Sequence, residues 1–64
     1  MTQKELSYVE DAIEHESTIL DGLNEAVNLL TEENLKEFIQ QEINKHEDTK
    51  QNLINLLEGE ANAW

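Results

Sequence analysis

The sequence predicts an all-α fold, an antiparallel hairpin of two helices. Proline is absent from the 64 residues, and glycine occurs only twice. Apolar residues recur with the alternating spacing of three and four residues that is typical of a heptad seam. The polar group at residues 31–34 is the only interior stretch that favours a break in the helix. We therefore expect residues 1–64 to form one helical-hairpin domain.

The first helix is predicted over about residues 3–30. Thr2 and Glu5 have the spacing of a capping box, in which each side chain accepts a hydrogen bond from the other residue's backbone. The predicted seam of this helix consists of Leu6, Val9, Ile13, Glu16, Leu20, Leu23, Val27 and Leu30.

A turn at residues 31–32 is expected to lead into a second helix over about residues 32–58. Thr31 is a suitable N-cap, and Gly59 is expected to end the helix and leave a short tail at 59–64. A connection this short forces the two helices antiparallel. The predicted seam of the second helix consists of Leu35, Ile39, Glu42, His46, Thr49, Leu53 and Leu56.

The composition excludes several classes of partner. Fifteen acidic residues against four lysines give a net charge of −11, which repels nucleic acid and anionic membranes. Cysteine is absent, so disulfides and thiolate chemistry are excluded. No apolar run approaches the ~18 residues of a membrane span, and the first residues lack the layout of a signal peptide. We expect a cytoplasmic protein whose partners are basic proteins, metal cations or copies of itself.

A hairpin of this length is too small to cover its own apolar flanks. Folding of so short a chain buries only about 60% of the surface that the unfolded chain exposes. A second hairpin packed face to face would complete a four-helix bundle, so we expect a homo-oligomer, a dimer. The flanking residues expected to stay wet in a monomer are Tyr8, Ile19, Ala26, Leu29, Phe38, Ile43, Ile54 and Leu57.

The predicted seams are interrupted by polar residues at one level of the hairpin. Glu16, Glu42 and His46 fall on interior positions, where a charge is costly unless it is paired or binds a metal. Carboxylates and imidazoles from facing helices bind iron or manganese in di-metal bundles. Alternatively, a polar layer sets register without any metal. The Glu-x-x-His spacing of di-iron bundles is absent, because Glu42 and His46 are four residues apart.

Residues 6–16, 33–46 and 53–57 resemble the short ferritin-like spore-coat proteins of spore-forming bacteria, which are related to rubrerythrin. The likeness covers nearly the whole chain and implies a dimeric ferritin-like hairpin in the spore coat, with other coat proteins as partners. It matches the metal-binding carboxylate and histidine of rubrerythrin to Glu16 and His46. Ile43 replaces the carboxylate that lies three residues before the histidine, which argues against oxidase or peroxidase activity.

These observations favour a non-enzymatic, self-associating structural protein without a cofactor. The first alternative is a bundle that binds two iron or manganese ions through Glu16, Glu42 and His46. The second is an acidic inhibitor that mimics nucleic acid, which fits less well because the carboxylates are distributed around both helices. No set of residues for nucleophilic catalysis or phosphate binding can be assembled from this sequence.

Overall fold

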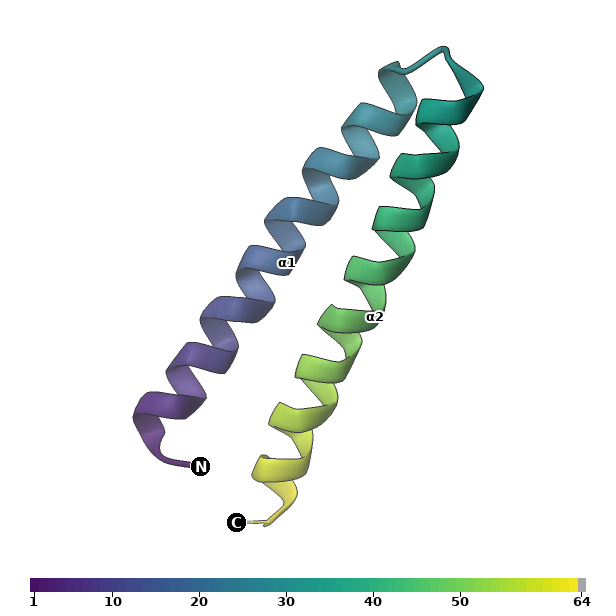
Figure 1. Ribbon diagram of the computed structural model, residues 1–64. Helices are drawn as coiled ribbons and strands as arrows, with labels where there is room; N and C mark the ends of the chain where they lie inside the picture. The colour runs from purple at the N-terminus through teal and green to yellow at the C-terminus, as the bar shows by residue number, and fades with distance from the viewer. Residues whose placement is uncertain (64) are drawn as a thin grey trace.

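Two long helices lie side by side and are joined at one end (Figure 1). The computed structural model describes residues 1–63, with side chains described as far as residue 59. Helix α1 spans Gln3–Leu29 and helix α2 spans Glu33–Ala63. The described residues contain no strand, so the predicted all-α hairpin is confirmed. Within the same range, neither helix is long and apolar enough to cross a membrane.

The predicted capping box at the start of α1 is present. The Glu5 backbone N–H donates to Thr2 Oγ1 at 3.1 Å, and the Thr2 backbone N–H donates to Glu5 Oε1 at 2.7 Å. These two bonds satisfy backbone donors that have no partner within the helix. The first turn is therefore fixed by two residues that were recognisable from their spacing.

The connection is one residue longer than the predicted turn. Leu30 is extended, with φ −76° and ψ 142°, while its N–H still donates to the Ala26 carbonyl at 3.0 Å. The first helical bond of α2 runs from Lys36 N to the Glu32 carbonyl at 3.0 Å. Glu32, and not Thr31 as predicted, is thus the residue that precedes α2. The extended Leu30 takes up part of the reversal and moves both helix ends by one residue.

Helix α2 does not end at Gly59 as predicted but continues to Ala63. A glycine ends a helix when it adopts a left-handed conformation, and no described glycine has a positive φ. Gly59 lies between the good helix formers Glu58 and Glu60, so it lowers helix stability by about 1 kcal/mol without breaking the helix. The predicted tail at 59–64 is therefore helical through 63, and residue 64 lies outside the described residues.

The hairpin is a single layer with a thin core. Its extents of 48 × 15 × 11 Å match two helices side by side with nothing packed above or below them. Leu20, 8% exposed, and Ile43, 2% exposed, are the only buried residues in the described part of the chain. All other seam residues are only half-buried, because each helix has one neighbour.

The seam of α1 is the predicted one. Leu20 is buried, and every other residue of the predicted set is half-buried, Glu16 included. The alternation of three and four residues therefore located the face of α1 that contacts α2. The residues on the face of α1 that points away from α2 are exposed.

The seam of α2 is rotated from the prediction. Leu35, Thr49 and Leu56 were expected inside and are exposed. Ile43 was expected to stay wet and is the most buried residue. The observed seam consists of Lys36, Ile39, Ile43, His46, Lys50, Leu53 and Leu57.

Two lysines explain why this seam was missed. Lys36 and Lys50 lie seven residues on either side of Ile43, and both are half-buried. A lysine can lay its apolar stem along a seam while its ammonium group reaches water. The rotated seam therefore buries Ile43 without burying the charge of either lysine.

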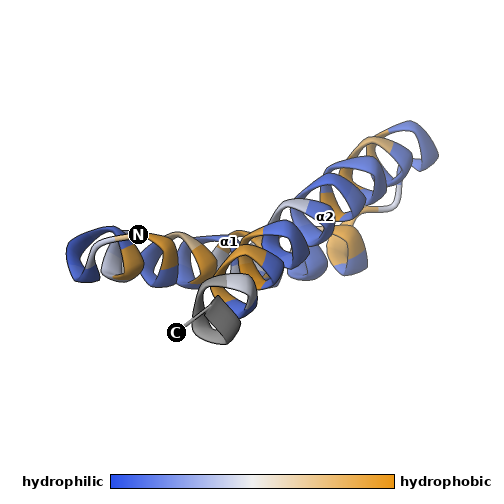
Figure 2. Cartoon of the chain, turned by 90° about the horizontal axis from the view of Figure 1, so that it is seen from below, coloured by the Kyte–Doolittle hydropathy of each residue, from blue (hydrophilic) through white to orange (hydrophobic). Residues whose placement is uncertain are grey.

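Large apolar side chains remain exposed on both helices. Figure 2 shows hydrophobic residues recurring along each helix between hydrophilic ones. The large apolar residues exposed are Tyr8, Ile19, Leu29, Leu35, Phe38 and Leu56.

Candidate functional site

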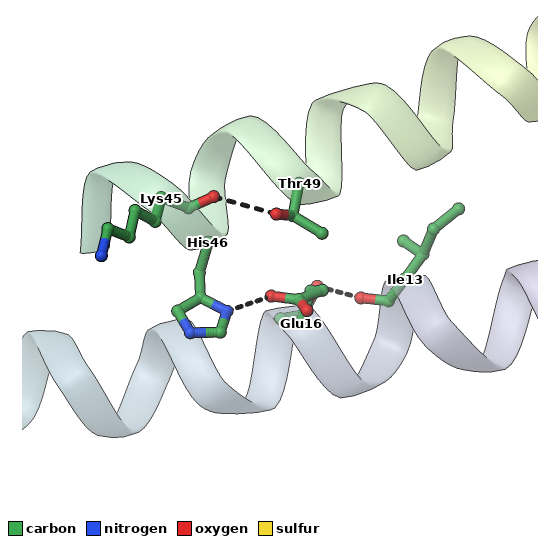
Figure 3. Close-up of polar contacts among 6 residues, drawn as sticks. Ile13, Glu16, Lys45, His46 and Thr49 are labelled. Atoms are coloured by element: carbon green, nitrogen blue, oxygen red, sulfur yellow. Dashed lines mark hydrogen bonds and ion pairs between the residues drawn. The ribbon is translucent and has the colours of Figure 1, made fainter. Parts of the chain in front are cut away.

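Glu16 and His46 form a contact across the seam, midway along the hairpin (Figure 3). Glu16 Oε2 lies 2.5 Å from His46 Nδ1, which is a short distance for such a pair. The Glu16 side chain is 16% exposed and the His46 side chain is 29% exposed. An ionised carboxylate only accepts hydrogen bonds, so the imidazole is the donor through Nδ1 when Glu16 is charged.

Each member of the pair is positioned by its own helix. Glu16 follows Ile13 by three residues on the α1 seam, and His46 follows Ile43 by three residues on the α2 seam. Apolar residues therefore flank the pair along the seam, while the helix edges remain open to water. This environment satisfies two polar groups through each other and does not enclose them.

The hydroxyl groups near the pair are bound elsewhere. Ser17 Oγ donates to the Ile13 carbonyl at 3.1 Å, and Thr49 Oγ1 donates to the Lys45 carbonyl at 3.1 Å. Figure 3 shows both bonds running along their own helices. Neither hydroxyl contributes to the contact between Glu16 and His46.

Glu42, the third predicted site residue, has a different partner. Its Oε1 lies 3.4 Å from Lys45 Nζ on the same helix, at the edge of the hairpin. The structure thus brings together two of the three predicted residues, Glu16 and His46, whereas Glu42, half-buried, is paired with exposed Lys45 on its own helix. A surface pair of this kind contributes about 0–1 kcal/mol.

The donor set of one chain is small for a metal centre. Among residues 1–63 no group of three histidine, aspartate or glutamate side chains is arranged to hold a metal ion. One carboxylate and one imidazole fall short of the four carboxylates and two histidines of a di-metal bundle. A di-metal centre of that kind would need further donors beyond this pair.

The sequence did not single out the half-buried lysines of the α2 seam. The feature that could have identified these lysines is their seven-residue spacing from Ile43. This spacing continues the heptad pattern with long-stemmed residues in place of apolar ones. His15, the other histidine, is exposed. The site is thus an imidazole–carboxylate pair within an otherwise apolar and lysine-edged seam.

The fold and this pair define the chain as an acidic two-helix hairpin in which Glu16 contacts His46 across the seam. Searches of protein-family models, of curated proteins and of solved structures found no match to it.

Proposed function

We propose that the chain is a non-enzymatic structural protein that acts by associating with copies of itself. The observation that supports this proposal is the imbalance between two buried residues, Leu20 and Ile43, and six large exposed apolar ones. A domain of this size needs disulfides, a metal or oligomerisation to gain stability, and the chain has no cysteine. Self-association covers apolar surface that the hairpin leaves in water.

The experiment is sedimentation of the purified chain between about 1 and 100 μM, combined with thermal unfolding followed by circular dichroism. We expect a dimer, and a melting temperature that rises with protein concentration because association is linked to folding. A cooperatively folded monomer whose melting temperature is independent of concentration would contradict the proposal.

Assembly in a spore coat is the finer form of this proposal. It is supported by the resemblance of residues 6–16 and 33–46 to ferritin-like coat proteins. A tagged copy expressed in a sporulating bacterium should then be recovered from the coat fraction, together with other coat proteins. Recovery from the soluble fraction alone would leave self-association standing and remove the coat assignment.

The contact between Glu16 and His46 favours one alternative, a metal-binding bundle. Two chains would supply two carboxylates and two imidazoles, which are suitable donors for divalent iron or manganese. Under this alternative, micromolar metal should raise the melting temperature by several degrees in a saturable way, and Glu16→Ala and His46→Leu should each abolish the increase.

The matched control for this experiment is Glu47→Ala, which removes an exposed carboxylate next to His46 in the sequence. Non-specific cation binding to the acidic surface would survive all three substitutions. A shift lost only in the Glu16 and His46 variants would establish the metal site and replace the purely structural function.

A further inference from the structure

One broad side of the hairpin carries a second apolar stripe in addition to the seam. On each helix the stripe consists of the residues that directly precede the seam residues in the sequence. Each of them is rotated by about 100° around the helix axis from the seam residue that follows it. Because the helices are antiparallel, this direction points to the same side of the hairpin in both. We call it the apolar side; it consists of Tyr8, Ala12, His15, Ile19, Gly22, Ala26 and Leu29 from α1, and Leu35, Phe38, Glu42, Lys45, Thr49, Asn52 and Leu56 from α2.

The apolar side is almost free of the charge that covers the rest of the chain. Among the residues named, Glu42 is the only acid, and Lys45 offsets it. Glu5, which precedes Leu6 of the seam, adds a second acid at the N-terminal end of α1. The opposite side consists of Ser7, Glu10, Glu14, Ser17, Asp21, Asn24 and Asn28 from α1, and Glu37, Gln40, Asn44, Glu47, Gln51, Ile54 and Glu58 from α2.

This distribution of charge selects the occupant. A basic partner would be attracted to the opposite side, which we call the acidic side. A second chain of net charge −11 can approach only a surface without excess negative charge. The apolar side, about 48 by 15 Å, has a projected area near the ~800 Å² per partner of a standard interface. Its charge and its size therefore both suit another copy of this chain.

We propose that a second copy packs on the apolar side about a twofold axis that passes beside Ile19, so that the two α1 helices are antiparallel. This inference rests on the proposed self-association and adds its surface and its geometry. An isologous contact requires residues on either side of the axis to match each other. Ala12 and Ala26 lie seven residues before and after Ile19, so each small residue faces the other across the interface.

The remaining α1 positions match in the same way. His15 lies four residues before Ile19 and Gly22 lies three after it, which places an imidazole opposite a residue without a side chain. A Cβ added at Gly22 would meet nothing within 4 Å in the single hairpin, so packing within the chain does not require a glycine there. Tyr8 and Leu29, 11 and 10 residues from Ile19, form the large apolar ends.

The charges of α2 agree with this axis. Since Glu16 contacts His46 in an antiparallel hairpin, Ile19 lies level with Ile43. The axis then passes α2 between Glu42 and Lys45. Glu42 of each copy is brought opposite Lys45 of the other, and two ion pairs form across the interface.

Single cysteine variants test the geometry, because the natural chain has no cysteine. We expect Ile19→Cys to form a disulfide-linked dimer on mild oxidation, since the two Cα atoms approach each other at the axis. Leu29→Cys should remain unlinked alone and link when mixed with Tyr8→Cys. Asn24→Cys, on the acidic side of α1, is the matched control. Faster linking of Leu29→Cys alone would show parallel packing, and faster linking of Asn24→Cys would show the wrong side; either result overturns the proposal.

A charge exchange tests the ion pairs without a covalent link. Glu42→Lys and Lys45→Glu should each raise the dissociation constant of the dimer about tenfold, since each places like charges across the axis twice. An equimolar mixture of the two variants should recover the natural affinity, although both variants keep a repulsive pair within their own helix. If the natural chain is a dimer and both variants and their mixture have the same dissociation constant as the natural chain, this geometry is overturned and self-association remains. A natural chain that stays monomeric would overturn both.

Discussion

Glu16 and His46 lie 30 residues apart in the sequence and are joined across the hairpin by a contact of 2.5 Å. The contact fixes the register of the two helices. A slip of seven residues would preserve the heptad pattern but would place Glu16 opposite Leu53 or Ile39. The carboxylate would then lose its only cross-helix partner, so the slipped hairpin is disfavoured. The contact between Glu16 and His46 thus favours this alignment over one slipped by a heptad.

The pair is expected to contribute to register more than to stability. His46→Leu alone should lower the free energy of unfolding, because it leaves the Glu16 carboxylate, only 16% exposed, without a partner. Glu16→Leu combined with His46→Leu should raise the free energy of unfolding by about 1 kcal/mol. Urea unfolding of the natural chain and both variants gives these values. A loss above about 2 kcal/mol in the double variant would show that the pair itself stabilises the fold.

The rotated seam of α2 predicts which truncations are costly. Ile43→Ala should lower the free energy of unfolding by about 2–4 kcal/mol, because it removes the most buried side chain of a thin core. Gln40→Ala, on the exposed surface of the same helix, is the control and should change it by less than about 0.5 kcal/mol. Chemical denaturation of both variants tests this. Equal effects would mean that α2 does not present Ile43 to α1.

The capping box predicts a pH dependence at the start of α1. The Thr2 backbone N–H, and then its hydroxyl, hold the pKa of Glu5 below its ordinary value. A carboxyl group whose pKa is lowered on folding stabilises the helix above its unfolded pKa and loses that contribution as the pH falls through the folded value. Glu5→Gln should therefore remove part of the loss of helicity on acidification, measured by circular dichroism, whereas Glu10→Gln, which has no capping role, should leave it unchanged.

Gly59 predicts a stabilising substitution. It lies within α2, its φ is negative, and a Cβ there would meet no atom within 4 Å. Gly59→Ala should therefore raise the free energy of unfolding by about 0.5–1 kcal/mol through reduced freedom of the unfolded chain. Thermal unfolding measures the gain. A loss would indicate that the glycine ends the helix after all, as its sequence context had suggested.

Helix α1 could be predicted from the sequence because its apolar residues allow one heptad phase only. The residues that flank its seam on one side are polar, such as Glu10, Ser17 and Asn24. The stripe on the other side is interrupted by His15 and Gly22, so it is less apolar than the seam. Length, capping box and seam were all confirmed, with a difference of one residue at the end.

Helix α2 could not be assigned in the same way because two phases fit it almost equally. Residues 39, 46 and 53 belong to both phases, and Leu56 is followed directly by Leu57, so either of these two leucines can face α1. Each phase contains four apolar residues, so counting them does not decide between the two, and the phase that includes Leu56 was predicted. The structure has the other phase, in which Ile43 is buried and lysine stems complete the seam.

The same ambiguity explains the candidate site. Glu16 belonged to a seam with one phase and was placed correctly. His46 is common to both phases of α2, so it reached Glu16 in either case, whereas Glu42 belonged only to the rejected phase and lies at the edge.

The short connection between the helices also determines the order in which the chain folds. Residues that face each other across the hairpin are close in sequence beside the turn and far apart at the open end. Each contact that forms shortens the loop that the next contact must close. We therefore expect the contacts between the helices to form first beside the turn and then progressively toward the open end. Most contacts within each helix are local, which favours fast folding. Residues beside the turn, such as Leu30, then govern how quickly the hairpin closes, and residues at the open end, such as Leu6, govern how slowly it opens.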